Sequence, residues 1–107
     1  MPVSAQDPAE FQAEKDRAVQ LVNQKKFAEA MPLLEKLAAS DRADGEVFLG
    51  LGIAKWLLQD PNDKVKWREL RLGAKKAFLR AKALGISLPE VDLIVASIND
   101  NGGDKNE

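Results

Sequence analysis

A pattern of small and bulky residues begins near residue 14 and returns, in part, 34 positions further along this 107-residue chain. The small residues Ala18 and Gly52 occupy equivalent places, and each copy continues into a second pattern, which starts at Ala30 and at Ala74. A recurring period of this length indicates repeated supersecondary units. The residues of the pattern are Glu14, Arg17, Ala18 and Leu21 with Phe48, Leu51 and Gly52, then Ala30, Leu34 and Leu37 with Ala74, Phe78 and Ala81.

The pattern resembles the tetratricopeptide repeat (TPR) family, whose unit is a pair of helices that approach closely through small residues. The resemblance covers residues about 12 to 85. It departs from the family at Glu14 and Lys55, where large or aromatic residues are usual, and at Ala74, which lies ten residues later than an unbroken period requires. The resemblance implies an all-α fold, a right-handed stack of antiparallel helix hairpins with about five helices. It also implies an adaptor or scaffold that binds another protein.

Capping residues indicate where the helices begin and end. Asp7 precedes Pro8, a pair suited to a helix start, and Asp63 can cap a later helix. Gly85 is suited to end that helix, and Ser87 to cap the last one through a capping box. The expected helices span residues 8–24, 27–39, 46–59, 63–84 and 89–99. Together they predict one helical domain over 8–99, a flexible N-terminus over 1–7 and a polar, disordered tail over 100–107.

The helix expected over 46–59 is almost free of charge. Between Val47 and Leu58 only Lys55 is charged, and apolar side chains point in every direction. Because a helix that is apolar all round is normally buried all round, we expect this helix to be covered by neighbours on every side.

Composition excludes several classes of function. The chain has no cysteine and no histidine, which removes the usual zinc ligand sets and Cys–His or Ser–His nucleophilic catalysis. We therefore expect no enzyme activity, no catalytic residues, no cofactor and no metal site. The first residues lack the basic and apolar regions of a signal peptide, and no apolar run is long enough to span a membrane. These features predict a cytoplasmic protein without a membrane span.

In the TPR family the first helix of each pair lines a concave groove in which partners bind. Carried over by the 34-residue register, the resemblance implies a mostly apolar groove that suits an apolar segment or helix of the partner. The alternative is that the same side chains are core, with Trp56 covered by the long helix. The implied groove residues are Lys15, Val19, Val22, Asn23, Leu49, Ile53 and Trp56.

A second candidate surface is electrostatic. Residues 64–82 contain eight basic residues and a single acidic one, Glu69, although the whole chain has a net charge of only −1. Five of the basic residues fall within roughly 60° of each other on a helix and form a basic ridge. The ridge could attract an acidic segment of a protein partner, or it could be an ordinary solvated face. Nucleic acid is an unlikely partner, because the chain is slightly acidic and lacks tyrosine for stacking. The basic ridge consists of Lys64, Arg68, Arg71, Lys75 and Lys82.

Val65, Leu72 and Leu79 form a smaller apolar strip on the same long helix. Packing by the last helix would cover this strip. If the last helix packs elsewhere, the strip is exposed and favours a homodimer. A self-associating structural module is therefore the alternative to an adaptor.

Overall fold

Five helices and no strand make up the part of the chain that the computed structural model describes, residues 7–104. This arrangement confirms the predicted all-α fold, and each helix lies within a few residues of its expected range. The expected flexible stretch 1–7 lies outside the described residues except for Asp7. The helices are α1 (Pro8–Asn23), α2 (Phe27–Ala38), α3 (Gly45–Leu57), α4 (Lys64–Ala83) and α5 (Pro89–Ser97).

Aspartate side chains start three of the helices. Asp7 accepts hydrogen bonds from the backbone N–H groups at the start of α1, and Asp63 accepts one at the start of α4, as predicted. Asp44 does the same for α3, where no cap was predicted. The predicted capping box at Ser87 is wrong: Leu88 holds the capping position of α5 without a side-chain hydrogen bond. A proline at the first turn leaves one amide fewer to satisfy there.

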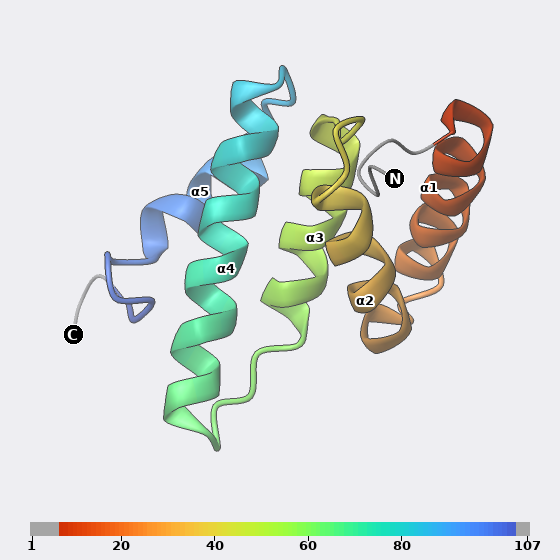
Figure 1. Cartoon of the computed structure of the whole chain (residues 1–107). Helices are drawn as coiled ribbons and strands as arrows, with labels where there is room; N and C mark the ends of the chain where they lie inside the picture. The colour runs from red at the N-terminus through yellow and green to blue at the C-terminus, as the bar shows by residue number, and fades with distance from the viewer. Residues whose placement is uncertain (1–6, 105–107) are drawn as a thin grey trace.

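The helices follow one another side by side, from α1 at one end to α4 and α5 at the other (Figure 1). α3 lies between α2 and α4 and also contacts α1, whereas α5 contacts α4. The expectation that α3 is covered on every side is wrong. Val47 and Ala54 are buried, but Leu49 and Ile53 are only half-buried and Leu57 is exposed. Three neighbouring helices leave one side of α3 open.

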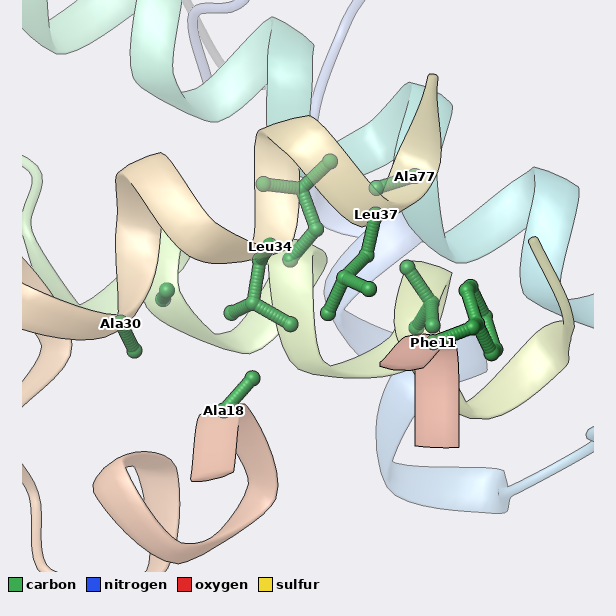
Figure 2. Close-up of a cluster of buried hydrophobic side chains, with 9 residues drawn as sticks. Phe11, Ala18, Ala30, Leu34, Leu37 and Ala77 are labelled. Atoms are coloured by element: carbon green, nitrogen blue, oxygen red, sulfur yellow. The ribbon is translucent and has the colours of Figure 1, made fainter. Parts of the chain in front are cut away.

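Small residues allow the first three helices to pack closely. Leu34 and Leu37 of α2 are fully buried and extend toward α1, where Phe11 and Ala18 lie (Figure 2). Ala18 and Ala30 are also fully buried and belong to the same apolar cluster. Because alanine adds little bulk beyond the backbone, the helix axes can approach while the leucines fill the space between them.

Residues 98–104 fold back onto α4. Ile98 is fully buried and forms an isolated antiparallel bridge with Asp104, while Gly102 and Gly103 are buried. Gly102 has a φ of +90°, and a Cβ there would collide with the backbone oxygen of Arg68. The expectation of a disordered tail is therefore wrong for residues 100–104, and residues 105–107 lie outside the described part of the chain. We call residues 98–104 the C-terminal segment.

Candidate interaction site

A hollow of about 150 Å³ opens on the uncovered side of α3, between α3 and α1. It contains five of the seven groove residues implied by the sequence: Val19, Val22, Asn23, Leu49 and Ile53. These residues recur at intervals of three or four along each helix, and this spacing places them on one face. The other residues that line the hollow are Leu34, Glu46 and Gly50.

Gly50 gives the hollow its depth. A Cβ at this position would lie 3.2 Å from a methyl carbon of Leu34, so any side chain would occupy the space in front of that leucine. Leu34 therefore forms part of an apolar wall. The polar groups that line the hollow are the amide of Asn23 and the carboxylate of Glu46. An arrangement of a few polar groups around an apolar centre is typical of binding sites.

Val19 is 37% exposed next to this hollow, whereas Lys15, one turn before it, is buried. A single exposed valine is common on a protein surface, but an exposed valine beside an apolar hollow offers a continuous contact area. No charged group other than Glu46 lines the hollow, so the chemistry of the site favours an apolar ligand group.

Lys15, the first implied groove residue, has a different role. Its side chain is buried, and its ammonium group donates hydrogen bonds to Asp44 at 2.7 Å and to Glu46 at 3.2 Å. These ion pairs join the middle of α1 to the start of α3. Lys15 is therefore occupied within the protein, and the interpretation of it as a groove residue open to a ligand is wrong.

The ion pair between Lys15 and Asp44 shifts the pKa values of both residues. Burial alone would lower the pKa of Lys15, but hydrogen bonds from Lys15 to Asp44 and Glu46, with the charges of both carboxylates, raise the pKa above its ordinary 10.5. Burial alone would raise the pKa of Asp44. The hydrogen bonds that it accepts from Lys15 and the Val47 amide, with the charge of Lys15, instead hold it below its ordinary 3.8. Both shifts favour the charged pair in the folded state.

We expect Lys15→Met to lower the free energy of unfolding by about 1 kcal/mol or less near neutral pH, because Asp44 remains partly solvated. The difference from the wild-type chain should persist over the pH range in which both groups are charged. It should shrink as the pH falls through the native pKa of Asp44, below 3.8, and as it rises through the native pKa of Lys15, above 10.5. Urea unfolding followed across pH measures this profile. If the difference in the free energy of unfolding grew as the pH fell, the ion pair between Lys15 and Asp44 would not be its cause.

Trp56 lies away from the hollow. Its ring is half-buried and faces α4, where the guanidinium carbon of Arg71 lies 4.9 Å from the ring centroid. The implied role of Trp56 in the groove is therefore wrong, and the alternative that the long helix covers it describes its position. The three-residue step from Ile53 keeps Trp56 near the same face of α3, so its spacing in the sequence did not separate it from the residues of the hollow.

The centre of the basic ridge is covered by the protein itself. Arg71 is only 5% exposed; its Nε donates to the carbonyl of Gly102 at 2.8 Å and its Nη2 to Asp104 at 2.6 Å. Its Nη1 donates to Gln59 at 3.1 Å, and its guanidinium carbon lies 4.5 Å from the ring centroid of Trp67 as well as close to Trp56. The guanidinium thus contacts two indole rings and binds the C-terminal segment.

The other ridge residues also have partners within the chain. Arg68 donates to Asn101, Lys75 to the carbonyl of Ile98, and Lys82 to Asp92 of α5. Lys64 lies over the ring of Trp67, with its ammonium nitrogen 4.7 Å from the centroid. The interpretation of this ridge as an open basic surface is wrong at its centre, where the C-terminal segment binds Arg68, Arg71 and Lys75. Lys64 and Lys82, at the two ends of the ridge, are exposed. The sequence alone could not show this coverage, since the covering residues follow the ridge by up to 33 positions.

Comparison with known proteins adds no relative: no protein-family model, no curated protein and no solved structure matches the chain. Within residues 7–104, no helix is both long enough and apolar enough to cross a membrane. The same residues contain no cluster of three or more acidic side chains that could hold a metal ion.

Proposed function

We propose that this chain is a TPR-like protein-interaction module without catalytic activity, and that it binds an apolar side chain of a partner protein in the hollow between α1 and α3. The observation that carries the proposal is the partly exposed Val19 beside an apolar hollow that no helix of the described chain fills. The binding element would be a short segment or an amphipathic helix, with one apolar residue as its central contact.

The size of the hollow supports a single inserted side chain. A cavity of about 150 Å³ is large enough for one aromatic ring or a branched aliphatic group, and too small for a folded domain. Asn23 could hydrogen-bond the backbone of the inserted segment, and Glu46 could pair with a basic residue next to the inserted side chain. The partner would then carry an apolar residue near a positive charge.

The titratable groups support binding over catalysis. Lys15, Lys36 and Asp44 have shifted pKa values, and each of them belongs to an ion pair within the protein. None of the three lines the hollow. A general acid or base would need a shifted group that reaches a substrate.

The test is partner binding by Val19→Glu. The wild-type chain serves as bait, the captured protein is identified by mass spectrometry, and its affinity for the purified chain is measured by calorimetry. We expect Val19→Glu to weaken binding at least tenfold, because it places a charge next to Glu46 at an apolar contact. Its helix content should remain that of the wild-type chain, since residue 19 is already partly exposed.

Leu93→Glu is the matched control. Leu93 is more exposed than Val19 and lies on α5, at the opposite end of the helix stack. The Leu93→Glu variant should therefore bind the partner with wild-type affinity. Equal affinity of the wild-type chain and the folded Val19→Glu variant would contradict the proposal. So would loss of binding in the Leu93→Glu control alone.

A further inference from the structure

Three basic side chains of α4 hold the C-terminal segment in the way that a protein site holds a peptide. Arg68, Arg71 and Lys75 recur at intervals of three and four residues, so they share one face of the helix. All three donate hydrogen bonds to the segment, and the acceptors are two backbone carbonyls, a side-chain amide and a carboxylate. These acceptors belong to Ile98, Gly102, Asn101 and Asp104 respectively.

The segment enters this site as a turn with its own internal hydrogen bonds. The side chain of Asn99 accepts from two backbone amides of the segment, which fixes the turn. Before the turn, Ile98 is fully buried, and within it Gly102 lies against the backbone oxygen of Arg68, where a Cβ would collide. The site therefore accepts an apolar side chain, then a turn with glycine at the closest approach, then a carboxylate.

The helix that carries the segment is loosely attached. Among the helices of residues 7–104, α5 contacts only α4, and none of its residues is buried. It leaves Val65 and Leu79 on the neighbouring strip of α4 exposed. By contrast, α4 packs on α3 through another face, which holds the buried Ala74 and Phe78. The segment can therefore leave α4 without opening the contact between α3 and α4.

The carboxylates of the segment are accessible to competition. The side chain of Asp104 is 59% exposed although it pairs with Arg71, and Asp100, which lies 3.7 Å from the ammonium of Lys75, is fully exposed. Ion pairs with such exposed partners are screened by water and contribute little to stability. An equivalent carboxylate from another molecule can replace them.

Arg71 creates the demand for such a replacement. Its guanidinium is effectively always charged, and it is 5% exposed while the segment is in place. If the segment lifts, two of its hydrogen bonds are lost beside two indole rings, in a setting where a charged hydrogen bond to a carboxylate is strong. The opened site is then an acceptor-poor, positively charged site.

We propose that this face of α4 is a binding site for an acidic, glycine-containing turn of a partner protein, and that the C-terminal segment closes the site until such a ligand displaces it. The combined charge of Arg68, Arg71 and Lys75 favours an acidic ligand over a neutral or basic one. The site is separate from the hollow between α1 and α3, so this inference does not rest on the function proposed above.

Calorimetry with a synthetic peptide tests the site. The peptide has the sequence of residues 96–104 with blocked ends, and it is titrated into the wild-type chain and into Gly102→Val. The valine side chain would collide with the backbone of Arg68 and keep the resident segment out of the site. We expect Gly102→Val to bind the peptide at least tenfold more tightly than the wild-type chain, whose tethered segment competes at a high effective concentration.

The control peptide carries valine at the position of Gly102 and should bind neither chain. Circular dichroism checks that Gly102→Val keeps the helix content of the wild-type chain. Equal affinity of the two chains for the natural peptide would overturn the proposal, as would a folded Gly102→Val chain that does not bind it.

A charge reversal tests which side chains recognise the peptide. Adding Lys75→Glu to the Gly102→Val chain should weaken peptide binding at least tenfold, because Lys75 donates to the segment and lies near its Asp100 carboxylate. Lys76→Glu is the matched control: it makes the same change one position along the helix, on an exposed side chain that points to another face. Equal losses in the two variants would indicate attraction by net charge alone and contradict a built site.

Hydrogen exchange of the wild-type chain tests the opening without any substitution. The chain is labelled with nitrogen-15 and the peptide is not, so nuclear magnetic resonance observes the chain alone. We expect the amides of Asn99 and Gly103, which are bonded within the segment, to exchange at least tenfold faster than amides in the middle of α4. Excess peptide should speed their exchange further and leave α4 unchanged. Segment amides that exchange no faster than those of α4 would show that the segment opens only on global unfolding, and would overturn the proposal.

Sedimentation velocity distinguishes a separate partner from a second copy of the chain. The wild-type chain should remain monomeric, because its own segment fills the site. A wild-type dimer that Gly102→Val abolishes would show that the segments exchange between copies, and would overturn the assignment of the site to a partner protein.

Discussion

Replacing Arg71 with alanine is expected to lower the free energy of unfolding by about 3 kcal/mol. The change removes a buried guanidinium that contacts two indole rings, and a cation–π contact is worth about 2 kcal/mol when it is desolvated. It also leaves the carbonyl of Gly102 and the side chain of Gln59 without their donor, and a buried acceptor without a partner costs about 1–3 kcal/mol. Urea unfolding followed by far-ultraviolet circular dichroism measures the effect.

Two milder substitutions separate the contributions at this site. Arg71→Lys keeps the charge but lacks the planar fork that reaches Gly102 and Asp104 together, so its loss should be intermediate. Asp104→Asn removes only a partly exposed ion pair and should cost less than about 1 kcal/mol. If Asp104→Asn were as destabilising as Arg71→Ala, the stacking and the backbone hydrogen bond would not be the main contributions.

Replacing Gly52 with alanine is expected to destabilise the protein by about 1–3 kcal/mol, although alanine is the better helix former. The new Cβ would lie 2.6 Å from two ring carbons of Phe78, which is fully buried and cannot move aside without disturbing the core. The cost of this overpacking should exceed the gain of about 1 kcal/mol in helix propensity. The same unfolding measurement tests this expectation.

Gly73→Ala is the matched control for Gly52→Ala. Both glycines lie inside a helix, but the nearest atoms to a Cβ at Gly73 belong to the flexible end of Lys55. That side chain can shift at little cost, so the helix-propensity gain should remain and the variant should be neutral or more stable. Destabilisation of both variants to the same extent would contradict the importance of the Phe78 contact.

Local signals in the sequence were sufficient to predict the approximate positions of the five helices. Asp7 and Asp63 have no competing role, so their capping could be predicted from position alone, and Gly85 adopts the positive φ of +104° that ends a helix. Asp44 was missed as a cap because the sequence before it consists of loop residues, and Ser87 was wrongly predicted as one. Whether a side chain caps a helix depends on the path of the backbone as it enters the helix. At Asp44 and Ser87 the adjacent residues do not determine that path.

The position of the hollow could be predicted in part, because the spacing of Val19, Val22 and Ile53 fixes a face of each helix. To predict that those two faces point toward each other required the resemblance to the TPR family as well as the spacing. Lys15 and Trp56 were misassigned for one reason: their partners, Asp44 and Arg71, are brought near by the packing of different helices. Ion pairs and ring contacts between distant residues have no local pattern in a sequence.

The C-terminal segment shows the same limitation. Its polar, glycine-rich composition is typical of disorder, but it is equally typical of tight turns. Asn99 accepts hydrogen bonds from the backbone amides of Asn101 and Gly103, which is a turn interaction, and Arg71 then holds the turn against α4. The contact with the buried Arg71 on α4 is what makes this segment an ordered turn and not a disordered tail.

The placement of Arg71 gives the protein a built-in optical probe. Both tryptophans of the chain, Trp56 and Trp67, contact this one guanidinium, and the chain contains no tyrosine. Intrinsic fluorescence therefore comes from a single place, the junction of α3, α4 and the C-terminal segment. Any event that lifts that segment from α4 would change the emission of both indoles at once, with no label attached.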